Sequence, residues 1–412
     1  MRFTFFHKDR PIGYMKKTAF WGIFITTLAC LSVILFERVL LWFSPQIGNF
    51  YEYDADLGFR VRPYTNDSNA FGFNDRDYPL QKPAGHFRIV VLGDSFSWAG
   101  GKDKNYTALL EHRFAEHYGH QRVEVINAGY PMTHTGEQLA LLKKYALQYK
   151  PDLVVLGFFC GNDILDADPH RKRIVIGGVS IDIDPRLGFS FFASPLTPGV
   201  IFLSTLKKLL VHATEFFSRL RQQSDTSADT PARPGCGSAG APACPASEET
   251  PGTFSRAAFL RIENKRLSAF DTRKHARGDF ENNIQFVFQN LSDMHALLHT
   301  QNIELLIALY PDEFQVNPPL LHEVLTTYHL DEKAYDLRLI QDLVTHYLRS
   351  QDIPVIDLLD GFLVHSKEQS LYLPRDTHWN EAGNALAADM LFSTLLAQIE
   401  ASFDPTLAVA PN

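Results

Sequence analysis

Three apolar runs in the first half of the chain are each followed by a short polar motif whose groups acyl transfer requires. GDS ends at Ser95 after the run RIVVL, NAG closes the run VEVIN and ends at Gly129, and GND is centred on Asn162 after LVVLGF. A serine hydroxyl attacks a carbonyl carbon when a base takes its proton, and the resulting oxyanion needs fixed hydrogen-bond donors. We therefore predict Ser95 as the nucleophile, with the N–H groups of Ser95 and Gly129 and the Asn162 amide as oxyanion donors.

The base for such a nucleophile is expected to be a histidine that a carboxylate holds in place. Among sixteen histidines, His378 stands out because it lies in DTHWN, residues 376–380, just before the last predicted helix. Side chains two residues apart on an extended chain point to the same side, so Asp376 can orient His378. Asp94 and Asp163 are the competing carboxylates, and their places in GDS and GND favour hydrogen bonds that hold those loops.

The order of these motifs, GDSF, the glycine of INAG, GND and DTHWN, resembles that of the SGNH (GDSL-type) hydrolases. The resemblance covers about residues 86–400 and is interrupted by an insertion. It implies a three-layer α/β/α flavodoxin-like fold, a triad of Ser95, His378 and Asp376, and an oxyanion hole from Ser95, Gly129 and Asn162. It also implies action on carboxylic esters, including lipids and acetylated sugars, with no metal and no organic cofactor.

One position departs from the commoner pattern of that family, which has its acid three residues before the histidine. Here that position is Arg375. The sequence D-x-H-W is also similar to the end of the triad in membrane-associated SGNH-like enzymes that acetylate polysaccharides, although the chain order differs there. Acyl transfer to a sugar hydroxyl is therefore an alternative to hydrolysis, and it would need a partner that supplies the acyl donor. A non-catalytic glycan- or lipid-binding module is an alternative from another class, since a fold alone does not establish activity.

Short Val- and Ile-rich runs that alternate with helical patterns predict a parallel sheet covered by helices on both faces. Strands are expected at 88–92, 123–127, 153–158, 303–309 and 355–357, and helices at 106–118, 135–149, 281–299, 334–348 and from 381 onward. Thr135 and Gln138 form a capping-box signature at the start of the second helix. The pair Gly177-Gly178 predicts a β-hairpin turn. An apolar stripe from Leu203 to Leu220 predicts a helix that packs on the domain, with a lid or a membrane-surface helix as alternatives.

The N-terminal part carries an uncharged apolar run, residues 19–36, which at about 1.5 Å per residue nearly spans a bilayer core. Five basic residues precede the run, and Arg38 is the only one in the twenty positions that follow. The positive-inside rule therefore predicts a cytoplasmic N-terminus and a domain outside the cytoplasm. We predict a single uncleaved membrane anchor, with a cleaved signal peptide as the alternative.

These patterns predict the organisation of the whole chain. The segments are a cytoplasmic N-terminus (1–17), a transmembrane anchor (18–40), a connecting arm (41–85), an SGNH hydrolase-like domain (86–400) with an insertion at about 165–278, and a C-terminal tail (401–412). Residues 222–252, rich in Ser, Thr, Ala, Pro and Gly, are predicted to be a flexible loop, in which Cys236 and Cys244 form a disulfide or remain free thiols. A length of 412 residues with 45% hydrophobic content excludes wholesale disorder, and a net charge of -8 gives no reason to expect a nucleic-acid partner.

Overall fold

A computed structural model gives the fold and describes residues 20–29, 31, 32, 35, 50–65, 67–118, 122–170, 172–176, 179–183 and 253–403. The chain divides into two compact units. One unit comprises Met1–Tyr51 and Ile174–Ala246, and the other comprises Glu52–Arg173 and Ser247–Asn412. All the residues predicted to carry the chemistry lie in the second unit.

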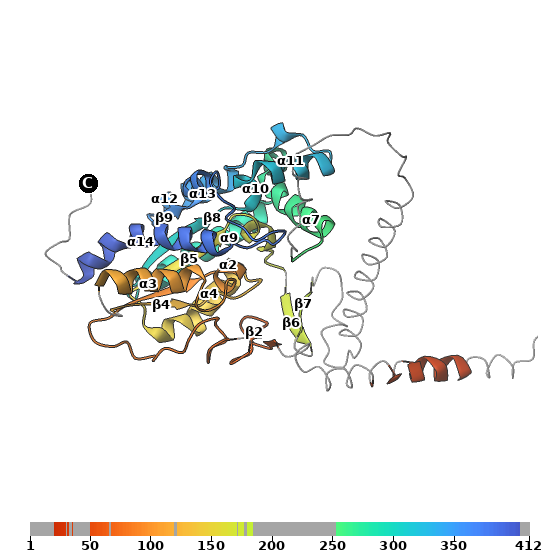
Figure 1. The fold of residues 1–412 in the computed structure, drawn as a ribbon. Helices are drawn as coiled ribbons and strands as arrows, with labels where there is room; N and C mark the ends of the chain where they lie inside the picture. Colours follow the sequence, from red (N-terminus) through yellow and green to blue (C-terminus); the bar gives the residue numbers. More distant parts are fainter. Residues whose placement is uncertain are drawn as a thin grey trace, which may run out of the picture. The chain divides into compact units, whose positions relative to one another are not determined.

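Five parallel strands form the central sheet of the second unit (Figure 1). They are β3 (Phe87–Leu92), β4 (Val123–Asn127), β5 (Leu153–Phe159), β8 (Glu304–Tyr310) and β9 (Val355–Asp357). Each strand lies within one residue of its predicted range, because short buried runs rich in Val, Ile and Leu favour the extended conformation. The spatial order β4-β3-β5-β8-β9 is 2-1-3-4-5 in chain order, which is the flavodoxin-like arrangement. The predicted α/β class with a parallel sheet is confirmed.

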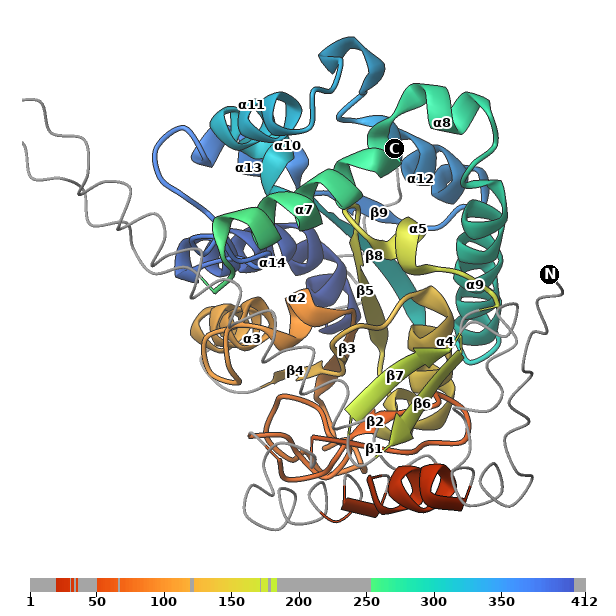
Figure 2. The ribbon, with the colours of Figure 1, turned by 90° about the vertical axis from the view of Figure 1, so that its right-hand side faces the viewer.

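Helices cover both faces of this sheet (Figure 2). One face is covered by α3 (Tyr106–Tyr118), α13 (Leu359–His365) and α14 (Glu381–Phe403), and the other by α4 (Thr135–Lys144), α9 (Glu281–His299) and α12 (Leu339–Ser350). Alternate side chains of a strand point to opposite faces. Ile89 and Val91 accordingly join the core cluster that contains Leu110 and Phe114 of α3 and Leu391 of α14.

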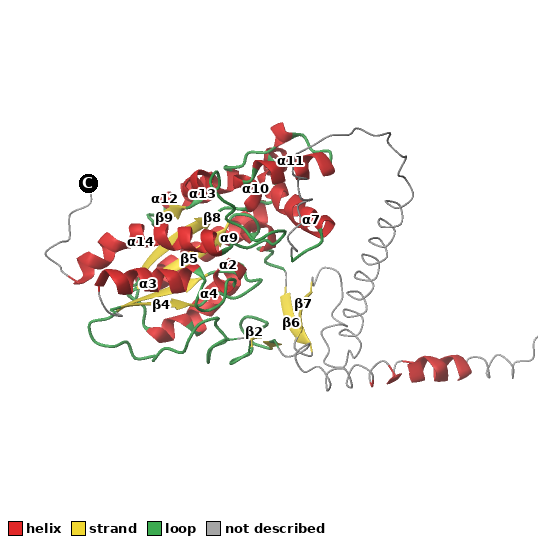
Figure 3. Cartoon of the chain, viewed as in Figure 1, coloured by secondary structure: helices red, strands yellow, loops and turns green. Residues whose placement is uncertain are grey.

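The remaining helices lie in the connections between these elements (Figure 3). They are α2 (Ser95–Trp98), η2 (Ala146–Tyr149), α5 (Asp163–Asp166), α7 (Arg256–Leu267), η5 (Ser268–Phe270), α8 (Thr272–Ala276), α10 (Glu313–Val316), α11 (Pro318–Thr327) and η6 (Glu332–Ala334). Both α2 and α5 begin directly after the sheet at the GDS and GND motifs, which places these motifs on the same edge.

The start of α4 differs by one residue from the predicted capping box. His134 is the N-cap: its Nδ1 accepts the Gly136 N–H at 3.1 Å, and the Glu137 carboxylate accepts the His134 N–H at 2.9 Å. Thr135 and Gln138 are buried instead, because this side of the helix turns into the domain. The Thr-x-x-Gln pattern therefore marked the right turn of the chain but the wrong register, and His134 has a structural role.

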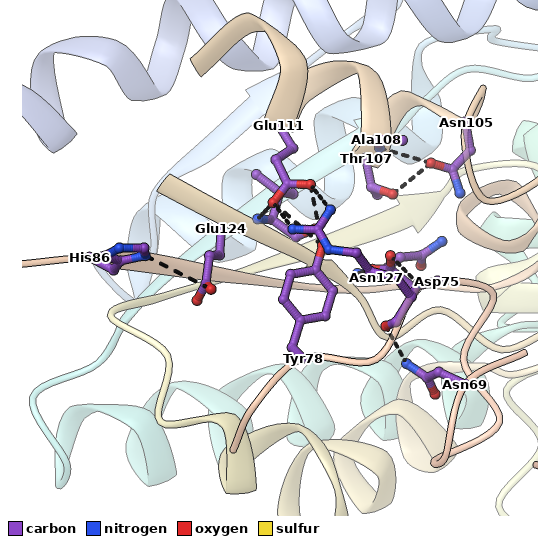
Figure 4. A network of polar contacts seen from close by, with 12 residues as sticks. Asn69, Asp75, Tyr78, His86, Asn105, Thr107, Ala108, Glu111, Glu124 and Asn127 are labelled. Atoms are coloured by element: carbon purple, nitrogen blue, oxygen red, sulfur yellow. Dashed lines mark hydrogen bonds and ion pairs between the residues drawn. The ribbon is translucent and has the colours of Figure 1, made fainter. Parts of the chain in front are cut away.

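Residues 52–85, which we call the arm, pack against the domain that was expected to begin at residue 86. The second compact unit starts at Glu52, and Phe59, Val61 and Phe73 of the arm are fully buried. Tyr78 donates from its hydroxyl to Glu111 on α3 at 3.3 Å and to the Val125 carbonyl oxygen on β4 at 3.2 Å (Figure 4). The arm contains β2 (Arg60–Val61), paired with β1 (Tyr51–Glu52), and otherwise turns, so no periodic pattern marked it in the sequence.

The predicted insertion at about 165–278 divides between the two units. Strands β6 (Lys172–Ile176) and β7 (Val179–Ile183) pair with each other, as the predicted hairpin requires. Helix α7 belongs to the second unit, with Phe259, Leu260 and Leu267 buried. The stripe from Leu203 to Leu220, the loop 222–252 with Cys236 and Cys244, and residues 404–412 of the tail lie outside the described residues.

The predicted anchor at 18–40 is described only at residues 20–29, 31, 32 and 35. Residues 20–29 are helical, and the side chains of Trp21, Ile23 and Ile25 are exposed. No helix within the described ranges has both the length and the apolar character needed to cross a membrane. The anchor therefore stays a prediction from the sequence.

Candidate active site

Ser95 is the first residue of α2 and lies at the carboxyl end of β3, where open parallel sheets bind their ligands. Asp94 caps this helix, because its Oδ1 accepts the Phe96 N–H at 2.9 Å. Ser95 is half-buried, and among the described residues its hydroxyl has no hydrogen-bond partner. The serine thus starts a tight turn from strand to helix with its hydroxyl uncommitted.

Asp376 and His378 lie in a loop that a short antiparallel contact closes at its base. Tyr372 and Trp379 form an antiparallel bridge, and the Leu373 N–H donates to the His378 carbonyl oxygen at 3.0 Å. Arg375 takes a left-handed conformation with φ 48°, which reverses the chain just before Asp376. The two residues are therefore brought together by a turn and not by the extended chain that the sequence reasoning assumed.

The turn gives Asp376 and His378 two hydrogen bonds. Oδ1 of Asp376 lies 2.6 Å from Nδ1 of His378, and the same oxygen accepts the His378 N–H at 3.1 Å. Burial by itself would raise the pKa of Asp376, but hydrogen bonds from His378 and Thr253 outweigh it and lower the pKa to about 2. Nε2 of His378 is buried without a partner among the described residues. A neutral imidazole held in this way carries its proton on Nδ1 and presents Nε2 as a base.

Phe96, the residue after Ser95, contacts both of the other loops. Its ring centroid lies 5.4 Å from that of His378, 5.0 Å from that of Trp379 and 4.2 Å from that of Phe159 at the end of β5. Residues almost 300 positions apart in the sequence therefore meet around one aromatic side chain. The structure brings the nucleophile turn, the GND strand and the DTHWN loop to one edge of the sheet.

The three predicted oxyanion donors differ in how they are engaged. Asn162 precedes α5 but its side chain does not cap that helix, and its Oδ1 is buried without a partner in the described part of the chain. The Gly129 N–H donates to Oδ1 of Asn127 at 3.0 Å, so an oxyanion would have to share or displace that contact. A Cβ on Gly129 would lie 2.3 Å from Cβ of Ser97, which explains why the close approach of α2 requires glycine there.

The competing carboxylates Asp94 and Asp163 hold loops, as their motif positions suggested. Asp94 accepts the Phe96 N–H, and Oδ2 of Asp163 accepts the Phe159 N–H at 2.9 Å. Both carboxyl groups are buried, and burial raises the pKa of each; the charge of Asp94 raises that of Asp163 further. Neither carboxyl group forms a hydrogen bond with His378, so Asp376 is the carboxylate that orients the histidine.

A buried polar group behind the GND loop was not foreseen from the sequence. Asp312, just after β8, lies so close to Gly161 that a Cβ there would meet its Oδ2 at 2.1 Å. Arg266 of α7 lies within ion-pair distance of both Asp312 (3.5 Å) and Glu263 (3.3 Å), and its guanidinium stacks over Phe159 at 4.8 Å. The position of Asp312 at the carboxyl end of a strand was the available signal. No cluster of His, Cys, Asp and Glu suited to a metal ion occurs among the residues whose placement is described.

Two protein-family models match separate parts of the chain. The GDSL-like lipase/acylhydrolase model matches residues 89–179, which contain Ser95, Gly129 and Asn162. The model of the SGNH hydrolase-like domain of acetyltransferase AlgX matches residues 270–408, which contain Asp376 and His378. Together with the five-stranded parallel sheet, these matches support the SGNH/GDSL hydrolase family. Each of the two matched segments is thus similar to part of an SGNH or GDSL hydrolase-like domain.

Solved structures that match the chain include two acetyl xylan esterases and TesA. An acetyl xylan esterase, AlAXEase, is 13% identical, with 75% of this chain and 100% of that chain covered and a TM-score of 0.38. A catalytic mutant of the acetylxylan esterase Axe2 from Geobacillus stearothermophilus is 10% identical, and the match covers 76% of this chain and 95% of that chain with a TM-score of 0.38. TesA is 14% identical, and the match covers 75% of this chain and 97% of that chain with a TM-score of 0.36. No curated protein matches this chain.

The contact between Asp376 and His378 predicts how activity responds to substitution. Asp376→Asn should lower kcat by about 10² to 10⁴-fold, because the amide no longer fixes the imidazole tautomer, and His378→Ala should cost more. Because the pKa of Asp376 lies below its ordinary value, this residue stays ionised above about pH 4 and loses its charge only as the pH falls toward 2. The acidic limb of the pH profile of kcat/KM should therefore come from another group. Hydrolysis of a chromogenic ester measures both the kcat of the variants and the pH profile. If Asp376→Ala keeps its activity while a folded Asp94→Ala or Asp163→Ala is inactive, Asp376 is not the carboxylate that orients His378.

Proposed function

We propose that this protein is a serine-dependent ester hydrolase of the SGNH type that acts on carboxylic esters of glycans or lipids through an acyl-Ser95 intermediate. The observation that carries the proposal is the hydrogen bond of 2.6 Å between Asp376 and His378, beside the turn that bears Ser95. Within the described part of the chain, Nε2 of His378 and the hydroxyl of Ser95 have no hydrogen-bond partner, as a base and a nucleophile require before substrate binds.

The acylation step follows from these groups. His378 Nε2 takes the proton of the Ser95 hydroxyl while Oγ attacks the ester carbonyl carbon. The carbonyl oxygen becomes an oxyanion that accepts hydrogen bonds from the Ser95 N–H, the Gly129 N–H and the Asn162 amide. The bond to the alcohol then breaks, and the alcohol leaves with the proton held on His378. Asp376 stays ionised and stabilises the imidazolium throughout.

Deacylation repeats the same chemistry with water as the attacking group. His378 takes a proton from water, the hydroxide adds to the acyl carbon, and the second oxyanion uses the same donors. When the bond to Ser95 Oγ breaks, the serine recovers its proton from His378 and the free acid leaves. No metal or organic cofactor enters these steps.

A second candidate function is transfer of the acyl group to a polysaccharide hydroxyl. The match of residues 270–408 to the SGNH hydrolase-like domain of an acetyltransferase favours it, because that segment contains Asp376 and His378. Hydrolysis and transfer share the acyl-Ser95 intermediate and differ only in the acceptor. Transfer also needs an acyl donor outside the cytoplasm, so it would require a membrane partner that supplies one.

We further propose that the domain is held at a membrane and works outside the cytoplasm. The support is the uncharged run at 19–36 with five basic residues before it. The exposed apolar side chains of the helical residues 20–29, such as Phe20, Trp21 and Ile23, are consistent with a lipid environment.

The role of Ser95 can be tested with a fluorophosphonate probe, which reacts with an activated serine hydroxyl. The wild-type protein should be labelled at Ser95, and Ser95→Ala should lose both labelling and ester turnover. Ser97→Ala, which alters the neighbouring buried hydroxyl, serves as the comparison for damage to α2. Undiminished turnover in Ser95→Ala would remove Ser95 from the mechanism, and absence of both labelling and turnover in the folded wild type would favour the non-catalytic binding module.

The choice of acceptor is measurable as a product ratio. The purified protein is given an activated acetyl ester with and without oligosaccharide acceptors, and free acid and acylated sugar are quantified. We expect free acid to dominate, because water is the default acceptor and transfer requires a site that holds an alcohol near His378. Acylated sugar forming faster than free acid would make transfer the function.

The membrane proposal predicts the location of the C-terminus. A reporter that is active only outside the cytoplasm, fused after residue 412, should be active, and a reporter active only in the cytoplasm should be silent. Deleting residues 18–40 should release the protein from the membrane fraction. The opposite reporter pattern would overturn the proposed topology.

A further inference from the structure

The helix that carries Ser95 is too short to satisfy its own carbonyl groups. α2 has four residues, and the last carbonyls of any helix lack partners within it. Three side-chain amides from outside α2 donate to these carbonyls. Nδ2 of Asn127 donates to the Ser97 carbonyl oxygen at 2.6 Å, Nδ2 of Asn74 donates to the Trp98 carbonyl oxygen at 2.6 Å, and Nδ2 of Asn105 lies farther from the Ser97 carbonyl oxygen, at 3.4 Å. The end of the nucleophile helix is therefore held by β4 and by the arm.

Asn127 also connects this helix to an oxyanion donor. Its Oδ1 accepts the Gly129 N–H at 3.0 Å, while its Nδ2 binds the Ser97 carbonyl oxygen. Asn127 is fully buried, and a single amide thus fixes the distance between the turn of Ser95 and the backbone of Gly129. Any rotation of Asn127 would move both groups.

The arm fixes Asn127 in turn. Oδ2 of Asp75 accepts the Asn127 N–H at 2.8 Å, and the Asn74 carbonyl oxygen accepts from Asn127 Nδ2 at 3.3 Å. Figure 4 shows Asp75 and Asn127 side by side. Although Asp75 as a whole residue is half-buried, its carboxyl group is turned toward Asn127. Asn74 is buried and bonds to both partners of the arrangement, α2 and β4.

We propose that Asn74 and Asp75 of the arm are positioning residues of the active site, which set Ser95 and Gly129 relative to each other through Asn127 and the end of α2. The proposal rests on the proposed acyl-serine function. It makes the arm part of the enzyme's working structure and not only a connection to the N-terminal segment. A shift of the contacts between the arm and Asn127 would misalign Ser95 and the Gly129 N–H, although neither Asn74 nor Asp75 contacts these two groups directly.

The test compares kcat per reactive serine with thermal stability. Each full-length variant is titrated with the fluorophosphonate probe, so that only molecules with a reactive Ser95 are counted, and kcat and KM for a chromogenic ester are measured at pH 8. Burial of the carboxyl group raises the pKa of Asp75 to about 7, so most of the Asp75 carboxyl groups are ionised at pH 8. We expect Asn74→Ala and Asp75→Ala to lower kcat per labelled site about tenfold, with KM changed less than about threefold.

Three comparison variants separate positioning from general destabilisation. Asp75→Asn keeps an oxygen that can accept the Asn127 N–H, so it should restore most of the kcat that Asp75→Ala loses. Val344→Ala removes buried volume from α12 and should lower the melting temperature while leaving kcat per labelled site unchanged. Asp77→Ala changes an exposed arm residue whose carboxylate, among the residues with a described placement, accepts the Ala70 N–H, and it should resemble the wild type.

The results have distinct meanings for the two proposals. If Asn74→Ala and Asp75→Ala lose stability but keep the wild-type kcat per labelled site, as Val344→Ala does, the positioning role is wrong while the acyl-serine function stands. A rise in KM with unchanged kcat in Asn74→Ala and Asp75→Ala would also overturn the positioning role. If Asn74→Ala does not fold, Asn74→Ser, which retains a hydroxyl donor, takes its place in the comparison. Failure of the probe to label Ser95 in the wild type would instead refute the function itself.

Discussion

Parallel pairing of β3 with both β4 and β5 is the constraint on which the candidate site depends. Val91 is in register with Asn127 on one side and with Val155 on the other. Strands β3 and β4 end within one residue of each other, and β5 continues to Phe159. Ser95, Gly129 and Asn162 are each within a few residues of a strand end. Because the backbone hydrogen bonds of the ladder fix that register, the three groups cannot move independently.

The base is added to this edge by a different kind of interaction. The loop from Tyr372 to Trp379 has no place in the central sheet, and aromatic packing around Phe96 and Trp379 holds it against the nucleophile turn. Within the loop, the left-handed Arg375 permits the turn that brings Asp376 back to His378. Side-chain packing thus sets the position of the base, and local backbone geometry sets the orientation of its partner.

The arm is a part of the domain that sequence periodicity does not predict. Its buried residues Phe59, Val61 and Phe73 come from turns and from one two-residue strand, so they lack the regular spacing that marks a helix or a strand face. Thr253, whose hydrogen bond helps to lower the pKa of Asp376, and Glu263, which pairs with Arg266, both lie in the segment that the sequence predicts to be an insertion. The capping box of α4 failed by one residue, because the sequence pattern fits two registers and only packing against α9 chooses between them.

The sequence by itself determined the five strands, the presence of the main helices and the residue types at the strand ends, but the helix predicted at 334–348 begins only at Leu339 and the one predicted at 135–149 gives way to a 3-10 turn after Lys144. These depend on local propensity and on burial of short apolar runs, which neighbouring residues reveal. The sequence also indicates Asp376 and His378 as partners. It predicts an extended chain between them, whereas in the structure a turn brings the two side chains together. Only the tertiary structure decided that Asn74 binds the end of α2 and that Asp75 accepts the Asn127 N–H. The contacts of Asn74 and Asp75 join residues that are between about 24 and 53 positions apart, and no local pattern encodes a hydrogen bond between residues that meet only when the sheet has formed.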